Sequence, residues 1–203
     1  MANDVLKEAE LDNQRLQRTI LHALRHDPWK YGLDLDDEGW APVEGLMSAL
    51  RVVCFHWTSL HWRDVERALG TGADRFQVQD GRIRASYGHS ISLTRPPAPT
   101  APPESLFHGT GTEVLPEVFR HGLQPGGRQF VHLTSDAAYA LQVSTMKSYG
   151  IVLVVKASQA HAHGICFRKA NHHVWLAKSV PAKFIEVTNI KAPAGIDPNH
   201  DHQ

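Results

Sequence analysis

Five of the twelve prolines in this 203-residue chain fall between Pro96 and Pro103. Proline fixes φ and removes a backbone N–H donor, so this stretch cannot lie inside a helix or a sheet. It is predicted to be a stiff, extended connector. We therefore place a domain boundary there. The division predicts one lobe over residues 1–95, a connector over 96–105, a second lobe over 106–190 and a frayed tail over 191–203.

The first lobe has the pattern of helices followed by a hairpin. Apolar residues at helical spacing predict a helix over 11–24. It should end just before Pro28, because the residue before a proline is pushed out of the helical region. Two further helices are predicted over 43–50 and 58–69. Alternating residues over 75–79 and 82–86 flank Asp80-Gly81, which is a strong hairpin signal. This order predicts a winged-helix-like lobe.

The second lobe alternates short β-prone runs with two helical stretches. Helices are expected over 113–121 and 136–146. The β-prone runs are 106–107, 130–133, 151–155, 174–176 and 184–187. The whole chain is thus predicted to be α+β, and the second lobe is predicted to have a small, mostly β core.

Charge and hydropathy exclude several classes of protein. Lys plus Arg number 21 and Asp plus Glu number 21, so a polyanion can be met only by a local cluster of cations. The longest apolar run, residues 151–155, is far shorter than the ~20 residues that span a bilayer. Cys54 and Cys166 lie in no paired motif, which argues against a disulfide scaffold, and the N-terminal residues do not resemble a signal peptide. We expect a soluble, cytoplasmic protein.

Two clusters of basic residues could hold a phosphate. Arg25-His26 stands where a helix gives way to a turn, and a guanidinium fork beside an imidazole suits an anion. Taken alone, this pair is also what a solvated helix end carries, because cations there favour the helix dipole. Arg75, Arg82 and Arg84 lie on the predicted hairpin, where they could instead form a charged, exposed sheet edge.

Several other motifs that could bind a ligand or a metal also have simple structural explanations. The glycines of His108-Gly-Thr-Gly-Thr112 permit close approach of a ligand, but the run fits neither a Rossmann nor a P-loop fingerprint and could be an ordinary turn. His161-Ala-His163, Cys166 and His172-His173 match no closed zinc pattern, so no metal site is predicted. The five tryptophans are interpreted as packing residues.

Taken in order, short motifs along residues 11 to 188 resemble the RNA 2′-phosphotransferase family, whose members use NAD to remove a 2′-phosphate from RNA. The motifs are Leu24-Arg-His-Asp-Pro28, Gly32-Leu-Asp-Leu-Asp-Asp-Glu-Gly-Trp40, Asp74-Arg-Phe76, Arg82-Ile-Arg-Ala85, Gly88-His-Ser90, Leu106-Phe-His-Gly-Thr110, Gly122-Leu123, Arg128, Val131-His-Leu-Thr134, Val174-Trp-Leu176, Val180-Pro181 and Phe184-Ile185. Their joint order is far more specific than any one of them.

The resemblance implies a winged-helix lobe joined to an ADP-ribosyltransferase-like lobe, with RNA and NAD meeting between them. It implies ADP-ribosylation of the RNA 2′-phosphate, followed by a transesterification that releases 2′-OH RNA and ADP-ribose 1″,2″-cyclic phosphate. The family's phosphate-binding tetrad maps onto Arg25, His26, Arg75 and Arg128. The NAD-binding positions map onto His108, Gly109, Thr110 and His132. NAD is consumed, no metal is implied, and we expect a monomer.

Two other functions stay open on the sequence. The same fold could ADP-ribosylate other nucleic-acid phosphates or a protein. Transferases that modify proteins commonly use a Glu near the third motif, and His173 stands there instead. The second alternative is a winged-helix regulator that binds nucleic acid without catalysis. Such a protein should have a basic recognition helix, whereas Arg63 and Arg67 alternate with Asp64 and Glu66 in the predicted third helix.

Overall fold

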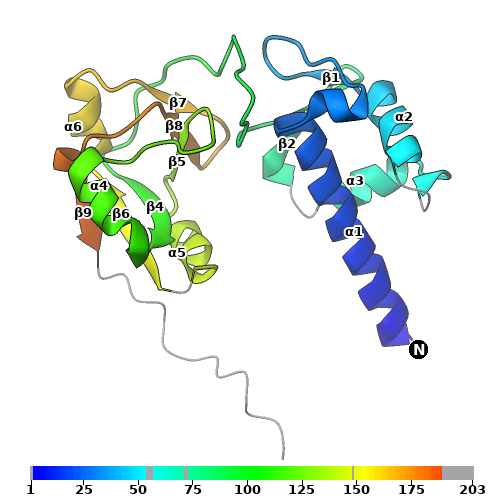
Figure 1. Cartoon of the computed structure of the whole chain (residues 1–203), viewed down its shortest axis with the longest axis horizontal. Helices are drawn as coiled ribbons and strands as arrows, with labels where there is room; N and C mark the ends of the chain where they lie inside the picture. The colour runs from blue at the N-terminus through cyan, green and yellow to red at the C-terminus, as the bar shows by residue number, and fades with distance from the viewer. Residues whose placement is uncertain (1, 54–56, 71–72, 148, 189–203) are drawn as a thin grey trace, which may run out of the picture.

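The computed structural model describes residues 2–53, 57–70, 73–147 and 149–188. Over these residues the chain is α+β, with a three-stranded and a six-stranded sheet (Figure 1). The first half contains α1 (Ala2–Arg25), η1 (Pro28–Tyr31), β1 (Ala41–Pro42), α2 (Val43–Val53), α3 (Trp62–Gly70), η3 (Ala73–Arg75), β2 (Phe76–Gln79) and β3 (Arg82–Ala85). No described helix has the length and apolar character that crossing a membrane requires.

The second half contains the larger sheet and its covering helices. Its elements are β4 (Leu106–Gly111), η4 (Thr112–Val114), α4 (Leu115–His121), β5 (Val131–Thr134), α5 (Ala137–Thr145), β6 (Gly150–Val155), α6 (Ala157–Ala162), β7 (Phe167–Lys169), β8 (Val174–Ala177), η5 (Ala182–Phe184) and β9 (Ile185–Thr188). The strand order is β7-β8-β5-β4-β6-β9, and every pairing in it is antiparallel. The elements β1, α6 and β7 were not predicted from the sequence.

Helix α1 ends where the sequence predicted. Its last residue is Arg25, and Pro28 then opens η1. The helix begins at Ala2, well before the predicted start at Leu11. Its C-terminal half packs into a buried cluster shared with α2, α3 and the hairpin, to which Ile20 and Leu24 contribute. This packing fixes the direction in which the end of α1 points.

The third helix starts later than expected. It was predicted from Thr58, but α3 begins at Trp62. The backbone N–H of His61 donates to the carboxylate of Asp64 at 3.0 Å, which is the contact that the third residue of a helix makes in a capping box. Leu60 is held in a preceding turn by a hydrogen bond from its N–H to the carbonyl of Trp57.

The predicted hairpin is confirmed. Strands β2 and β3 pair from Phe76↔Ala85 to Gln79↔Arg82. Asp80 and Gly81 form the turn with φ of 49° and 70°. Two positive φ values in a row define the turn that matches the twist of the flanking strands.

The proline-rich segment is not a free connector. It forms neither helix nor strand beyond an isolated bridge from Pro99 to Arg168, which lies in the edge strand β7. The N–H of Thr100 donates to the carbonyl of Phe167 at 2.9 Å, and the Arg168 guanidinium donates to the carbonyl of Pro97. Because proline has no N–H to donate to a further strand, this segment covers the edge formed by β7 and prevents another strand from pairing there.

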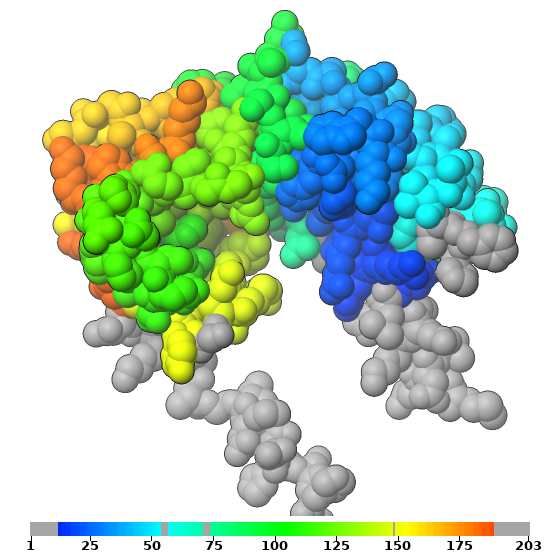
Figure 2. Space-filling view, in the orientation of Figure 1, coloured from blue at the N-terminus to red at the C-terminus, as the bar shows by residue number. Residues whose placement is uncertain are grey.

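The two halves make direct contact. Tyr87, which follows β3, packs against a small cluster formed by Phe130, Ala170, Val174 and Leu176 of the second half. The side chain of Asn171 donates to the carbonyl of Asp74 at 2.8 Å. Figure 2 shows the surface hollowed between the blue residues of the first half and the green and yellow residues of the second.

Candidate active site

A cavity of about 750 Å³ is lined by residues of both halves. The first half contributes Arg25, His26, Arg75, Tyr87 and Ser90. The second half contributes residues of β4, β5 and α5 together with the turn before β5. All eight site residues expected from the sequence line this cavity: Arg25, His26, Arg75, His108, Gly109, Thr110, Arg128 and His132. Residues more than 100 positions apart in sequence thus meet at one place.

Arg25 is the most constrained cation of the cavity. Its Nε and Nη2 are buried and have no hydrogen-bond partner among the described residues. Burial lowers the pKa of Arg25 to about 10; Tyr87 opposes this effect in part, and the charges of Arg75 and Arg128 add to it. A buried donor without a partner is costly, so these nitrogens are suited to an anion that enters from solvent.

The surroundings of Arg25 fix its position. Its guanidinium lies 5.0 Å from the centre of the Tyr87 ring, in cation–π contact. A Cβ on Gly88 would lie 3.0 Å from the guanidinium carbon. Gly88 also has a φ of +92°, which side chains rarely tolerate. The glycine of the Gly88-His89-Ser90 motif therefore makes room for the arginine.

His26 is held by the same segment. Its Nδ1 lies 3.0 Å from Oγ of Ser90, and the N–H of Ser90 donates to the carbonyl of Arg25. Burial lowers the pKa of His26, and the charges of His22, Arg25 and Arg128 lower it further. A bound phosphate dianion would act in the opposite direction and favour the imidazolium.

Arg75 and Arg128 complete the cationic wall. Arg75 ends η3, and its carbonyl accepts from Ser86, which ties it to the strand pair. Arg128 stands in the turn before β5, where its N–H donates to the carbonyl of Pro125 at 3.2 Å. Its Nη1 lies 3.1 Å from Nδ1 of His132. The three arginines belong to three separate segments, and only the fold brings them together.

The opposite wall is built on β4 and β5. His108, Gly109 and Thr110 pair with Leu153, Val152 and Ile151 of β6. Nδ1 of His108 lies 2.8 Å from the carbonyl of His132, and burial lowers the pKa of His108. Burial, followed by the charge of Arg128, lowers the pKa of His132 to about 3. Both imidazoles are therefore neutral near pH 7.

Gly109 has a packing role. A Cβ at this position would lie 2.0 Å from the carbonyl oxygen of Ala140 in α5. Only glycine allows α5 to rest against β4 so closely. The glycine therefore sets the shape of the cavity whether or not a ligand touches it.

Two tyrosines of the cavity were not identified from the sequence. Tyr87 and Tyr139 both line it, and burial together with Tyr139 raises the pKa of Tyr87 to about 12. The ring of Tyr87 also lies 5.8 Å from that of His132. An aromatic residue beside a Gly-His-Ser motif was the available signal, but tyrosines are more often packing residues.

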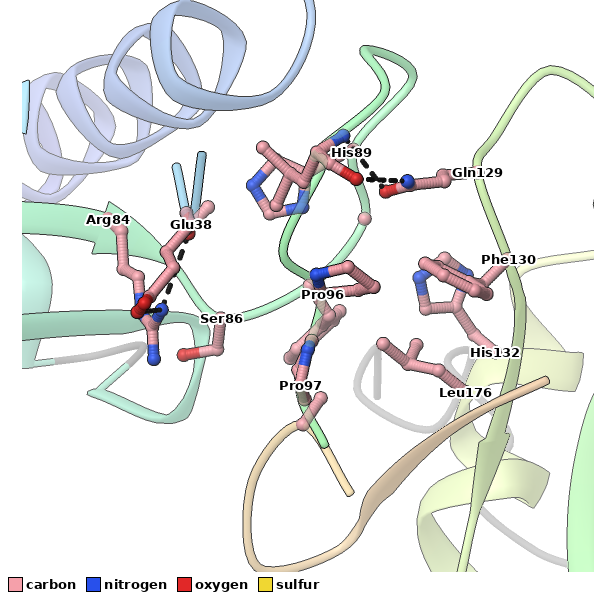
Figure 3. A pocket seen from close by; sticks show the side chains of 15 residues that line it. Glu38, Arg84, Ser86, His89, Pro96, Pro97, Gln129, Phe130, His132 and Leu176 are labelled. Atoms are coloured by element: carbon pink, nitrogen blue, oxygen red, sulfur yellow. Dashed lines mark hydrogen bonds and ion pairs between the residues drawn. The ribbon is translucent and has the colours of Figure 1, made fainter. Parts of the chain in front are cut away.

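A second, small cavity of about 30 Å³ shares Tyr87, Phe130 and His132 with the lining of the first; Figure 3 shows this small cavity. His89 and His132 both line it, and Nε2 of His89 is buried without a partner among the described residues. The carbonyl of His89 accepts from the N–H of Gln129 at 2.9 Å. The Gln129 side chain in turn donates to the carbonyl of Leu93 at 2.8 Å. These hydrogen bonds join the two halves next to the larger cavity, and the small cavity fits about one water molecule.

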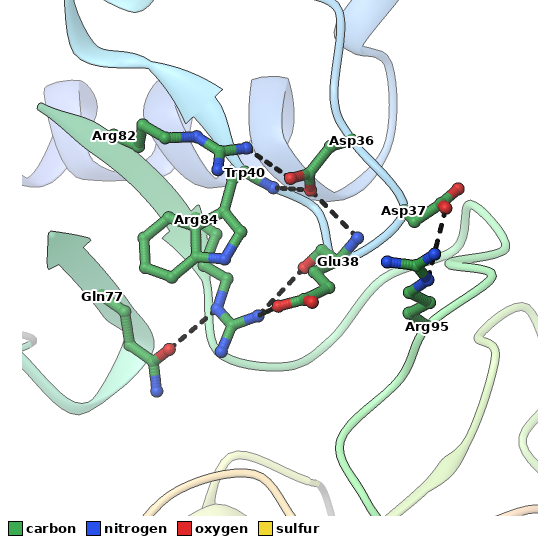
Figure 4. A network of polar contacts seen from close by, with 8 residues as sticks. All are labelled: Asp36, Asp37, Glu38, Trp40, Gln77, Arg82, Arg84 and Arg95. Atoms are coloured by element: carbon green, nitrogen blue, oxygen red, sulfur yellow. Dashed lines mark hydrogen bonds and ion pairs between the residues drawn. The ribbon is translucent and has the colours of Figure 1, made fainter. Parts of the chain in front are cut away.

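The other candidate clusters lie elsewhere. Arg82 and Arg84 pair with Asp36 and Glu38 on the surface, as expected for a charged hairpin (Figure 4). His161 and His163 are exposed on or just after α6, and Cys166 is exposed after it. Cys54 lies outside the described residues.

The histidine pair between β7 and β8 takes part in a contact between the halves. Nδ1 of His172 lies 3.1 Å from the carboxylate of Asp74, and Nε2 of His172 lies 2.8 Å from Nδ1 of His173. These three residues could together hold a metal ion, although they lie outside the lining of the active-site cavity. Sequence spacing could not show this, because Asp74 is almost a hundred residues away.

The interpretation of all five tryptophans as packing residues was wrong for one of them. Trp57 and Trp175 are buried, but the side chain of Trp29 is 69% exposed on η1.

Comparison with known proteins decides the family. Residues 12–179 match the model of the family described as RNA 2′-phosphotransferase, Tpt1/KptA family. The chain belongs to this family. All eight expected site residues, from Arg25 to His132, lie inside the part that matches.

Proteins from three organisms illustrate how similar this Tpt1/KptA family member is to its relatives. A protein of Acetivibrio thermocellus named "Probable RNA 2′-phosphotransferase" is 39% identical over 177 residues, which cover 86% of this chain and 97% of the relative. A protein of the same name from Agrobacterium fabrum is 40% identical and covers 83% and 91%. One from Aeropyrum pernix is 37% identical and covers 84% and 78%. The similarity thus spans most of the length of these relatives.

Proposed function

We propose that this protein removes an internal 2′-phosphate from RNA and transfers it to NAD. The observation that carries the proposal is the charge of the cavity. Four permanent cations line it, namely Arg25, Arg75, Arg128 and Lys147. Among the described residues that line it, no Asp or Glu is present. Such a cavity favours a dianionic phosphate over a cationic group at the same place.

The phosphate is held by the arginines. Guanidinium forks donate two parallel hydrogen bonds to phosphate oxygens, and Arg25 has two buried nitrogens free to do so. Arg75 and Arg128 approach from other segments, so the three cations surround the anion. Donors fixed in this way stabilise charge as it moves during reaction, which is usually the largest catalytic effect.

NAD supplies the acceptor of the phosphate. The RNA 2′-phosphate attacks the nicotinamide ribose at C1″ and nicotinamide leaves; the ribose 2″-hydroxyl then attacks phosphorus, and the bond to the RNA 2′-oxygen breaks. The products are 2′-OH RNA and ADP-ribose 1″,2″-cyclic phosphate. His26 donates the proton that the departing 2′-oxygen needs, and the proton that the attacking 2″-hydroxyl loses passes to solvent. The phosphate beside His26, a dianion before ADP-ribosylation and a monoanionic diester after it, favours the imidazolium.

The wall formed by β4 and β5 is proposed to bind NAD through His108, Gly109, Thr110 and His132. A cavity of about 750 Å³ falls within the ordinary range for small-molecule sites. The neutral imidazoles of His108 and His132 and the hydroxyl of Thr110 can orient ribose hydroxyl groups without adding charge. The reaction as proposed requires no metal ion.

The finer description of the fold is also a proposal. The element order α1-β1-α2-α3-β2-β3, with its three strands paired in one sheet, supports a winged-helix-like lobe over residues 1–95. The six-stranded sheet supports an ADP-ribosyltransferase-like lobe over 106–190, with residues 96–105 between the two lobes. The predicted tail over 191–203 lies outside the described residues. We infer a cytoplasmic monomer that binds RNA across the face where the lobes meet.

The alternatives have less support. A transferase that modifies proteins would need a carboxylate in the cavity, and none is described there. A regulator that binds duplex DNA would need a basic third helix, but in α3 Arg67 is paired with Asp64 at 3.7 Å.

The experiment is to incubate the protein with RNA that carries one internal 2′-phosphate, with and without NAD and, in each case, with and without a metal chelator. We expect NAD-dependent release of nicotinamide and conversion of the RNA to its 2′-OH form, unaffected by the chelator. Dephosphorylation without NAD, or activity that is lost on chelation and restored by zinc or magnesium, would contradict the proposal.

A further inference from the structure

A shallow groove lies next to the active site on the side of His26 that faces α1. Its volume is about 300 Å³, and it is lined by Arg18, Thr19 and His22 of α1 and by Lys30 and Tyr31 of η1. None of these five residues lines the active-site cavity. The groove is therefore a separate feature, and the function described so far does not use it.

The groove and the active site are adjacent. His22 belongs to the last turn of α1 and lies four residues before His26, which follows the helix, and the two ring centroids are 5.8 Å apart. The hydroxyl of Tyr31 lies 3.2 Å from Nδ1 of His22, which fixes the orientation of that ring. A strand that leaves the cavity beside His26 in this direction therefore enters the groove directly.

The positive charge of the groove is not neutralised by the described residues. Arg18 and Lys30 are exposed, and no ion pair joins either of them to another described residue. The carboxylate of Asp27 at the edge of the groove faces His22 at 3.4 Å. Two permanent cations against one carboxylate leave a net attraction for an anion.

The other surfaces of the first half that an RNA strand could cross as it leaves the active site are less favourable for a polyanion. Arg82, Arg84 and Arg95 are paired with Asp36, Glu38 and Asp37 respectively, so the hairpin side has no free cation among these three (Figure 4). A larger groove beside Trp29 contains Asp34 and Asp36 and no Lys or Arg among the described residues that line it. Of these surfaces, the groove on α1 alone combines a position beside His26 with cations that have no ion pair to another described residue.

We propose that this groove binds the backbone phosphodiester on the far side of the nucleotide that flanks the 2′-phosphate, a group that a dinucleotide lacks, so that the single RNA strand crosses the C-terminal turns of α1 instead of the hairpin. The inference rests on the proposed function for the substrate class. It adds the path of the strand and two positioning residues, Arg18 and Lys30. Because the contact is to a phosphate, it adds affinity without sequence preference.

The test measures binding without NAD, so that no turnover occurs. The dissociation constant of a single-stranded RNA with one internal 2′-phosphate is measured over a series of salt concentrations for wild type and for Arg18→Ala/Lys30→Ala. We expect weaker binding by the variant. The slope of log K against log salt should be shallower by about 0.7 for each phosphate that the variant no longer neutralises. A dinucleotide with the same 2′-phosphate should bind both proteins equally.

Matched variants separate this effect from a change in net charge. Lys178→Ala/Lys183→Ala removes two exposed lysines outside both cavities and should leave the slope unchanged. Arg18→Lys/Lys30→Arg should keep the wild-type slope. If Arg18→Ala/Lys30→Ala leaves the slope unchanged, or if the lysine control lowers it equally, the proposed groove is wrong.

The dinucleotide allows the proposed reaction to be tested independently of the proposed groove. Its NAD-dependent dephosphorylation by wild type tests the proposed function and does not depend on the groove. If the wild-type protein fails there while the salt slope still changes as expected, the reaction is wrong and the RNA path stands. If Arg18→Ala/Lys30→Ala also loses affinity for the dinucleotide or unfolds at lower temperature, the two cations act on the site or on α1, and the inference is overturned.

Discussion

Nη1 of Arg128 lies 3.1 Å from Nδ1 of His132, so one hydrogen bond joins the cationic wall of the cavity to the wall on β5. Burial and the charge of Arg128 hold the pKa of His132 near 3, which leaves its ring neutral and able to accept this bond. The residue proposed to hold phosphate and the residue proposed to contact NAD are therefore coupled. A substitution at either Arg128 or His132 should therefore alter the binding of both the phosphate and NAD.

The four residues around the phosphate should differ in timing. In the proposed mechanism, Arg25, Arg75 and Arg128 hold the anion throughout, but they matter most when its charge redistributes in the second step. His26 is needed only when the 2′-oxygen leaves. We expect alanine at an arginine to slow transesterification by roughly 10²–10³-fold and at His26 by roughly 10²–10⁴-fold. ADP-ribosylated RNA should then accumulate in a single-turnover assay.

Lysine tests the geometry of the same site. Arg25→Lys keeps the charge but loses the fork, so it should restore only part of the lost rate. Wild-type turnover by both Arg25→Ala and His26→Ala would place the phosphate site elsewhere.

NAD should stabilise the protein against heat through the β4 and β5 wall. A ligand at about 100 times its Kd adds about 2.7 kcal/mol. For a chain of this size we expect Tm to rise by roughly 5–10 °C. Alanine at His108, Thr110 or His132 should reduce this rise. His132→Ala should also slow the second step, because it removes the partner of Arg128. An unchanged rise in all three variants would show that NAD binds elsewhere.

Gly109→Ala should disturb the packing of α5. The new methyl would lie 2.0 Å from the Ala140 carbonyl, so helix and strand must separate. Overpacking of this kind costs about 1–3 kcal/mol of unfolding free energy. Urea unfolding measures it, and Gly70→Ala is the control, because a Cβ there meets nothing within 4 Å. Equal stability of the two variants would contradict the close contact of α5 with β4.

Two buried histidines should make stability depend on pH. Burial, followed by the charge of Arg25, lowers the pKa of His89 from 6.5 to about 4, and the pKa of His132 is lowered to about 3. Below pH 6.5 these histidines therefore bind protons in the unfolded chain but not in the folded one. The free energy of unfolding decreases as the pH falls, until the pH reaches the pKa of the histidine in the folded state. Each group contributes at most about 1.4 kcal/mol per pH unit in that window.

Urea unfolding between pH 7 and about 4 checks this slope. His89→Gln, which cannot titrate, should flatten it even if its stability near pH 7 is lower. His161→Gln changes an exposed residue and should leave the slope as in wild type. An unaltered slope in His89→Gln would mean that His89 is charged in the folded protein or does not titrate differently on unfolding.

Local signals in the sequence predicted local structure well. Pro28 fixed the end of α1, and Asp80-Gly81 fixed the hairpin, because backbone sterics act within a few residues. The start of α3 was missed because Asp64 caps the helix, and the first turn gives no hydrophobic period to show it. Helix α6 and strand β7 were missed because each is short and lacks a clear apolar repeat.

The candidate site was predicted through the order of motifs and not through any single motif. Nothing near Arg25 in sequence shows that Arg75 and Arg128 will face it. Contacts that depend on the tertiary arrangement stayed hidden, such as Tyr87 against Arg25 and the proline-rich segment on Arg168. A proline run predicts an extended segment, but it does not show which surface that segment covers.

The fate of the phosphate tests the central claim most directly. RNA labelled with radioactive phosphorus in its internal 2′-phosphate is incubated with the wild-type protein and NAD, and the products are separated. We predict that all released label appears in ADP-ribose 1″,2″-cyclic phosphate and that, in His26→Ala, label stalls on ADP-ribosylated RNA. Release of the label as inorganic phosphate would contradict this mechanism.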